Sequence, residues 1–148
     1  NLLIGARTAE DVKIAVASAV DLNEKIETTM RGRDLVTGLP KEITVSSKEV
    51  KKAIAKSVKT LVEVIREIVE QTPPELLGDI MKRGIVLSGG GSLLRGIDEI
   101  INRETSIAVK IADDPLTAVA RGTGVVLEDI SKYKDLLASR EYLTAPRE

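Results

Sequence analysis

Apolar residues recur at steps of three and four along much of the chain, the spacing that places them on one face of an α-helix. The longest such stretch predicts a long helix whose apolar positions are Val50, Ala53, Ile54, Val58, Leu61, Val62, Ile65, Ile68 and Val69. Ser46 and Glu49 have the spacing of a capping box at its start, and Pro73-Pro74 ends it near Gln71. The stripe spans too few heptads to require a coiled-coil partner, so we expect it to lie in the core.

The same spacing predicts a shorter helix on each side of the long one. Thr8 is expected to cap the first of them, with Asp11 as a capping-box variant. Its apolar positions are Ala9, Val12, Val16, Ala19 and Val20. Thr72 and Glu75 predict another capping box, for a helix with proline in its first turn and Gly84 as its terminating glycine. The residues of that helix expected in the core are Leu76, Leu77, Ile80 and Met81.

Apolar and polar residues alternate over Ile26–Ser46, as in strands with one wet face. The tetrapeptide Thr37-Gly38-Leu39-Pro40 interrupts the alternation with a turn signal. We therefore predict a β-hairpin, or a pair of adjacent strands, over this range.

The most distinctive run of the chain is IVLSGGGSLLRG, from Ile85 to Gly96. Its first residues predict a short buried strand, and its consecutive glycines permit backbone conformations closed to other residues. Apolar residues at helical spacing follow at Leu93, Leu94, Ile97, Ile100 and Ile101. Strand, turn and helix together would place a ligand against bare backbone at a positive helix N-terminus. A tight turn without a ligand needs the same residues, so the pattern alone leaves both interpretations open.

A second strand is expected at Ile107, Val109 and Ile111, and Asp114 is expected to cap a further helix with Pro115 at its first position. The order strand, helix, strand, helix predicts a parallel βαβ unit with a right-handed crossover. Asp113 and Asp114 are also a carboxylate pair. Because Asp114 has a capping role and no other ligand is near in sequence, we predict no metal site there.

Composition excludes several kinds of chemistry. The 148 residues include 43% hydrophobic residues, no histidine and no cysteine, which excludes a Ser-His-Asp triad, histidine-bound zinc and thiolate chemistry. The net charge of −1 predicts no general attraction to nucleic acid. No window is apolar enough to span a membrane, no signal-peptide pattern is present, and the start at Asn1 suggests part of a longer protein. Arg31, Arg33 and Arg95 are either partners for acidic groups or phosphate, or isolated surface arginines.

Four stretches of the chain resemble the MreB family of bacterial actin-like proteins. They are RGRDLVTGLP (31–40), TPPEL (72–76), the glycine run and DDPLTAVA (113–120). The resemblance covers Asn1 to about Leu137, and the first two stretches are its most specific part. The glycine run is shared more widely, across the actin, Hsp70 and sugar-kinase superfamily. The chain departs from the family in having neither of the Asp- and Gly-rich phosphate loops.

The resemblance implies an α/β fold, namely the second lobe of an actin/Hsp70/sugar-kinase-like protein. Residues 1–48 would form part of its small outer α+β subdomain with the β-hairpin. Residues 49–137 would form the inner α/β subdomain with the parallel βαβ unit, and residues 138–148 a polar C-terminal tail.

The resemblance also implies a nucleotide site on the adenosine side of ATP. The residues that would contact the nucleotide are Glu10, Asp11, Val12, Lys13, Gly89, Gly90, Gly91, Ser92 and Leu93. Glu10 would accept hydrogen bonds from the ribose and Lys13 would lie along the base. The alternative is that these acidic residues favour a helix N-terminus and that Lys13 is solvated. No catalytic residue and no metal ligand is expected in this chain.

The whole protein is expected to be a weak cytoskeletal ATPase that binds Mg-ATP and forms filaments with itself. Those filaments would lie in the cytoplasm along the inner membrane, held there by segments outside this chain. With membrane-bound wall-synthesis proteins, they would control rod shape. The isolated chain is expected to be inactive. The alternatives are a nucleotide-free actin-like scaffold module and a sugar-kinase-superfamily enzyme.

Overall fold

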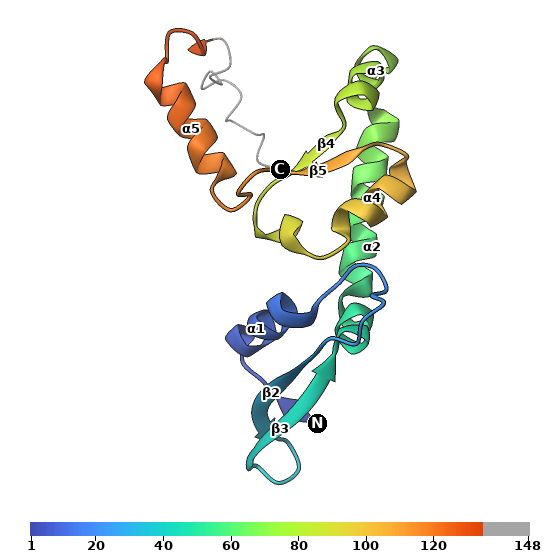
Figure 1. Ribbon diagram of the computed structural model, residues 1–148, viewed down its shortest axis with the longest axis vertical. Helices are drawn as coiled ribbons and strands as arrows, with labels where there is room; N and C mark the ends of the chain where they lie inside the picture. Colours follow the sequence, from blue (N-terminus) through green and yellow to red (C-terminus); the bar gives the residue numbers. More distant parts are fainter. Residues whose placement is uncertain (135–148) are drawn as a thin grey trace, which may run out of the picture.

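The computed structural model describes residues 1–134 of the chain. Two groups of elements lie one above the other along a single long helix, α2 (Figure 1). In chain order the elements are β1 (Leu2–Leu3), α1 (Ala6–Val16), β2 (Glu27–Asp34), β3 (Pro40–Ser46), α2 (Ser47–Gln71), α3 (Pro74–Arg83), β4 (Ile85–Leu87), the 3-10 turn η1 (Gly90–Leu93), α4 (Ile97–Thr105), β5 (Val109–Ile111) and α5 (Ala118–Glu128). In this part of the chain no helix is long and apolar enough to cross a membrane.

The predicted hairpin is confirmed. Strands β2 and β3 pair antiparallel, with Met30 opposite Ile43, and β1 adds to the free edge of β2. The turn between them contains Gly38 at φ +73°, a conformation that favours glycine. Helix α1 lies against β2. Together these elements form the end of the molecule that carries the N-terminus (Figure 1).

The predicted cap of the first helix is wrong. Helix α1 begins at Ala6, with Gly5 at the N-cap and no side-chain cap, so Thr8 and Asp11 lie inside the helix. The helix also ends earlier than expected, at Val16. Its predicted last turn instead runs in extended conformation, because Ala19 donates its backbone N–H to another segment, the carbonyl of Arg95.

Helix α2 begins and ends as predicted. Ser46 and Glu49 form the capping box, in which the Glu49 carboxylate accepts the Ser46 N–H at 2.9 Å and the Ser46 hydroxyl accepts the Glu49 N–H at 3.4 Å. The expectation that its whole apolar stripe lies in the core is wrong. Val58 and Val62 are buried, whereas Ile68 is 61% exposed. The buried apolar residues lie where the helix packs against α4, and the helix also contacts α1 and β3.

The predicted parallel strand pair is also confirmed, since β4 pairs with β5 with Val86 opposite Lys110. The glycine run differs from expectation, because no helix follows it directly. The glycines form the short turn η1, Leu94 is extended, and Gly96 at φ +72° precedes the first residue of α4. Leu93 consequently lies outside α4 and is 54% exposed.

Helix α3 has the predicted proline in its first turn and ends at Gly84, at φ +78°. The capping box expected for it is wrong. Pro73 is the N-cap, and the hydroxyl of Thr72 donates back to the carbonyl of Ile68 at 2.7 Å. Leu76 is 56% exposed, and α3 has no buried residue, which contradicts its expected place in the core.

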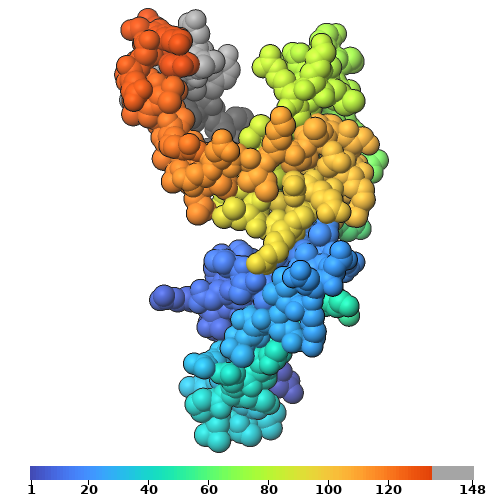
Figure 2. Space-filling model, in the orientation of Figure 1, coloured from blue at the N-terminus to red at the C-terminus, as the bar shows by residue number. Residues whose placement is uncertain are grey.

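Helix α5 starts later than predicted. Asp114 has φ +44° and heads a turn in which its carbonyl accepts the N–H of Thr117 at 3.1 Å, so the helix begins at Ala118 and Asp114 does not cap it. No residue of α5 is buried. Figure 2 shows α5 and α3 as two separate projections, in orange-red and yellow-green. The polar tail predicted from residue 138 lies outside the described residues.

Candidate nucleotide-binding site

The glycine turn is held from within by one buried side chain. Ser92 is 4% exposed, and its hydroxyl donates to the carbonyl of Gly89 at 2.7 Å. Gly89 has φ +79°, which any other residue would adopt with strain. Its N–H donates to the carbonyl of Pro115 at 2.7 Å, which ties the turn to the segment after β5. The turn is therefore rigid at its start without help from a ligand.

The next two glycines are not required by the backbone. Neither Gly90 nor Gly91 has a positive φ. A Cβ on Gly91 would meet nothing within 4 Å, and one on Gly90 would touch only Leu116 Cδ2, at an ordinary 3.4 Å. Among the described residues, the fold thus has room for a Cβ at both positions. Bare backbone there leaves room for a ligand to approach closely.

The helix N-terminus expected beside the glycines is not there. Because η1 and an extended residue intervene, α4 opens at Ile97, after its N-cap Gly96. A ligand at this turn would meet the backbone of Gly90 and Gly91 rather than the start of a regular helix. The sequence could not reveal this, since Leu93 and Leu94 fit the helical spacing of α4 without belonging to it.

On α1, the candidate residues divide between solvent and core. Glu10 and Lys13 form an ion pair, with 2.8 Å between Oε2 and Nζ, and both side chains are about half exposed. Val12 is 8% exposed and packs inward. Asp11 is exposed and borders a hollow of about 400 Å³ beside β2, whose other lining residues are Thr8, Val12, Thr28, Thr29 and Arg31. Glu10 and Lys13 therefore present polar groups to solvent on a helix that Val12 anchors.

Two further residues, which the sequence did not single out for this role, join the two candidate segments. Ser18 follows α1 closely, Arg95 follows η1 closely, and they pair as an isolated parallel bridge. The Arg95 guanidinium Nη1 donates to the carbonyl of Ala17 at 3.2 Å. Arg95 is thus an exposed arginine whose guanidinium bonds a backbone carbonyl rather than an acidic side chain. In Figure 1, α1 (blue) and the glycine turn (yellow) lie on the same side of α2, with α1 nearer the hairpin.

Two other charged groups, the candidate Arg31 and Arg121 near the Asp113-Asp114 pair, have local partners. Arg31 pairs with the Glu42 carboxylate across the hairpin, and this contact raises the pKa of the Arg31 guanidinium. Arg121 donates to the carbonyl of Asp113. Within residues 1–134 no cluster of three or more acidic side chains is arranged to hold a metal ion.

Another hollow, of about 720 Å³, lies away from the candidate site. It is bounded by α2, α4 and residues 18–21, and it contains none of the predicted nucleotide-contacting residues. Its walls alternate between apolar side chains and charged pairs such as Lys59–Glu63, at 3.5 Å.

A family model and individual relatives both match this chain to MreB and Mbl proteins. The family model described as MreB/Mbl protein matches residues 1–135. The cell shape-determining protein Mbl of Bacillus subtilis (strain 168) is 47% identical over 131 residues, which are 88% of this chain and 39% of that protein. The cell shape-determining protein MreB of Escherichia coli (strain K12) is 44% identical over 139 residues, 94% of this chain and 40% of that protein. The chain thus spans about two fifths of the length of these relatives.

Solved structures agree. The crystal structure of MreB5 of Spiroplasma citri bound to ADP superposes with a TM-score of 0.84 at 39% identity, covering 91% of this chain and 41% of that one. The same protein bound to AMPPNP gives a TM-score of 0.83. A MamK structure, at 23% identity and a TM-score of 0.68, shares the fold.

Proposed function

Since the chain belongs to the MreB/Mbl family and has its actin-like α/β fold, we propose that it is the C-terminal lobe of a cytoskeletal ATPase that determines cell shape. In this proposal residues 1–48 belong to the outer subdomain of the lobe and residues 49–137 to the inner one. The lobe binds the adenosine side of ATP, while Mg²⁺ and the phosphates are held by segments outside this chain. No catalytic residue lies in the chain itself.

The observation that carries the proposal is the bare backbone at Gly90 and Gly91. The fold accepts side chains at both positions, yet both are glycine, in a turn that Ser92 holds rigid. Helix α1 lies on the same side of α2 as the glycine turn (Figure 1). Its residues Glu10 and Lys13 offer an acceptor and a cation suited to ribose hydroxyls and a purine ring. The relative MreB5, 39% identical, has been crystallised with ADP and with AMPPNP, which supports a nucleotide ligand here.

Self-association is the second part of the proposal. Large apolar side chains are exposed at the hairpin end of the chain, namely Leu35, Val36 and Leu39, at 61%, 79% and 65%. Leu76 and Met81 of α3 are exposed at the opposite end (Figure 1). Apolar surface at both ends of an elongated unit suits head-to-tail contact between copies. The filaments would lie in the cytoplasm along the inner membrane and position membrane-bound wall-synthesis proteins.

One experiment separates this proposal from its alternatives. ATP is titrated into the complete protein by calorimetry, and the protein is then sedimented with and without ATP. The proposed function requires nucleotide binding together with nucleotide-dependent pelleting. Pelleting without binding would instead identify a nucleotide-free scaffold, and ATP turnover that depends on an added sugar would identify a kinase.

A further inference from the structure

The place where the two candidate nucleotide segments meet is an organised contact of its own. We call it the 17–20/94–96 junction. Ala17 and Ser18 are 2% and 1% exposed, so the start of its 17–20 segment is almost completely buried. The N–H of Ala19 donates to the carbonyl of Arg95 at 2.8 Å, and the Arg95 side chain returns a bond to Ala17. Arg95 thus bonds the 17–20 segment through both its backbone carbonyl and its guanidinium.

Ser18 supplies a third set of contacts. Its buried hydroxyl lies 2.8 Å from the carbonyl of Val20 and 3.2 Å from that of Arg95, and it accepts the N–H of Val20 at 3.2 Å. Buried hydroxyls cost stability unless they are bonded in this way. Gly96 is packed directly against Val20, since a Cβ at Gly96 would lie 2.4 Å from Val20 Cγ2. The junction therefore has little freedom to slide.

Hydrogen bonds run through the junction from one candidate segment to the other. On α1, the carbonyl of Lys13 accepts the N–H of Ala17 at 2.9 Å. The carbonyl of Ala17 accepts the Arg95 guanidinium at 3.2 Å. Directly before Arg95, the N–H of Leu94 donates to the carbonyl of Gly91 at 3.2 Å. A displacement of α1 is thus transmitted to the glycine turn through bonded groups rather than through solvent.

We propose that this junction sets the spacing between α1 and the glycine turn, and that Ser18 and Arg95 are positioning residues for the nucleotide. The inference rests on the proposed function. Arg95 and Ser18 would not touch the nucleotide. They would fix the position of α1, which carries Glu10, relative to the bare backbone of Gly91. Such preorganisation lowers the ordering cost that a ligand otherwise meets on binding.

The test measures the dissociation constant of AMPPNP and the unfolding temperature of the complete protein. Arg95→Met keeps the apolar stem and the backbone bonds and removes only the guanidinium donor. Ser18→Ala removes the buried hydroxyl from the 17–20 segment, on the other side of the junction. Each should raise the dissociation constant about three- to ten-fold. The matched control is Arg103→Met, on α4, whose exposed side chain pairs with Glu104 at 3.4 Å; it should change the constant less than two-fold.

A double-mutant cycle distinguishes positioning from simple stabilisation. If the junction places Glu10 against the ribose, Glu10→Gln should weaken binding less in the Arg95→Met background than in the wild type. Independent effects, or a lowered unfolding temperature with unchanged affinity in both single variants, would overturn the inference. A wild-type protein that does not bind AMPPNP would instead overturn the proposed function. Binding that all the junction variants retain would leave that function intact while refuting the positioning role.

Discussion

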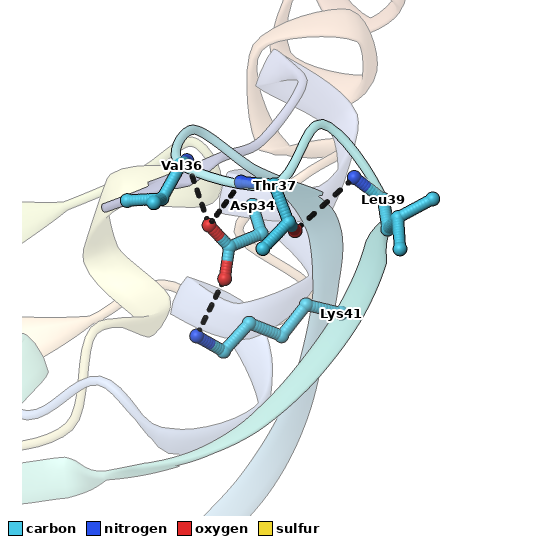
Figure 3. A network of polar contacts seen from close by, with 5 residues as sticks. All are labelled: Asp34, Val36, Thr37, Leu39 and Lys41. Atoms are coloured by element: carbon cyan, nitrogen blue, oxygen red, sulfur yellow. Dashed lines mark hydrogen bonds and ion pairs between the residues drawn. The ribbon is translucent and has the colours of Figure 1, made fainter.

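The carboxylate of Asp34 lies 2.7 Å from the ammonium of Lys41 and closes the hairpin turn from inside (Figure 3). Its other oxygen accepts the backbone N–H groups of Val36 at 2.8 Å and Thr37 at 3.3 Å. The hydrogen bond from Lys41, followed by those from the backbone, lowers the pKa of Asp34 from 3.8 to about 2. An ionised carboxylate, with its residue 8% exposed, thus organises the end of the molecule proposed to meet another copy.

The first prediction concerns pH. Because the folded pKa of Asp34 lies below its unfolded value of about 3.9, its ionised form stabilises the fold above about pH 4. That contribution is lost as the pH falls through about 2. At pH 7, Asp34→Asn should therefore lower the unfolding temperature by a few degrees. The difference between variant and wild type should shrink on acidification, as followed by circular dichroism. A constant difference down to pH 2 would contradict the ion pair.

The capping box at the start of α2 gives a second prediction. Ser46→Ala removes the acceptor for the Glu49 N–H, so the free energy of unfolding should fall by about 1 kcal/mol, within a range of about 0.5–2. Ser57→Ala is the control, because Ser57 is exposed within the same helix and alanine favours helix. Urea unfolding of both variants measures the effect. Equal midpoints would show that the box contributes nothing.

Gly90→Val separates a ligand site from a structural turn. A Cβ at this position meets only Leu116 Cδ2, at 3.4 Å, so the fold should lose little stability. The branched side chain would occupy the space proposed for the nucleotide, and ATP affinity of the complete protein should fall at least about ten-fold, or about 1.4 kcal/mol. Calorimetric titration and thermal unfolding measure the two effects. A collapse of the unfolding temperature with unchanged affinity would identify the glycines as structural.

Glu10→Gln tests the α1 side of the site. It removes the charged acceptor while keeping the shape of the side chain, and should weaken ATP binding by the complete protein about ten-fold. The unfolding temperature should hardly change, because the Glu10–Lys13 pair is half exposed and contributes little. Glu63→Gln, which breaks a comparable exposed pair with Lys59, is the matched control. Equal ATP affinity in Glu10→Gln and wild type would show that Glu10 does not contact the nucleotide and that this segment is an ordinary helix start.

Residues 1–148 alone should not hydrolyse ATP. Phosphoryl transfer depends on groups that hold the phosphates, the Mg²⁺ and the attacking water, and the chain has neither of the phosphate loops of its family. Phosphate release with Mg-ATP is compared between the purified chain and the complete protein. Turnover by the chain at the rate of the complete protein would refute the assignment of catalysis to other segments.

The sequence predicted those elements whose causes lie within a few residues. The capping box at Ser46, the proline stop after Gln71 and the turn around Gly38 all depend on short-range contacts, and all are present. The parallel pairing of β4 with β5 also followed from element order alone. For the candidate site, the glycine turn was found at its observed position, whereas the regular helix expected directly after it was not.

The sequence could not predict features decided by distant partners. Helix α1 stops at Val16 where the chain pairs with Arg95, and the Ser18 hydroxyl bonds a carbonyl 77 positions away in the chain. No local signal marks such a contact. The prediction of which apolar side chains are buried failed for a related reason. Periodicity identifies the apolar face of a helix but not what covers it, so Leu76 and Met81 of α3 were expected inside and are exposed.

Helix α2 connects the hairpin to the parallel strands, and its buried apolar residues, Val58 and Val62, lie near its middle. Its 25 residues, at about 1.5 Å of rise each, make a rod about 37 Å long. A tilt of about 5° around one end would move the other by about 3 Å, roughly the length of one hydrogen bond. Small rearrangements at one end of the chain would reach the other as displacements large enough to make or break contacts between neighbouring copies.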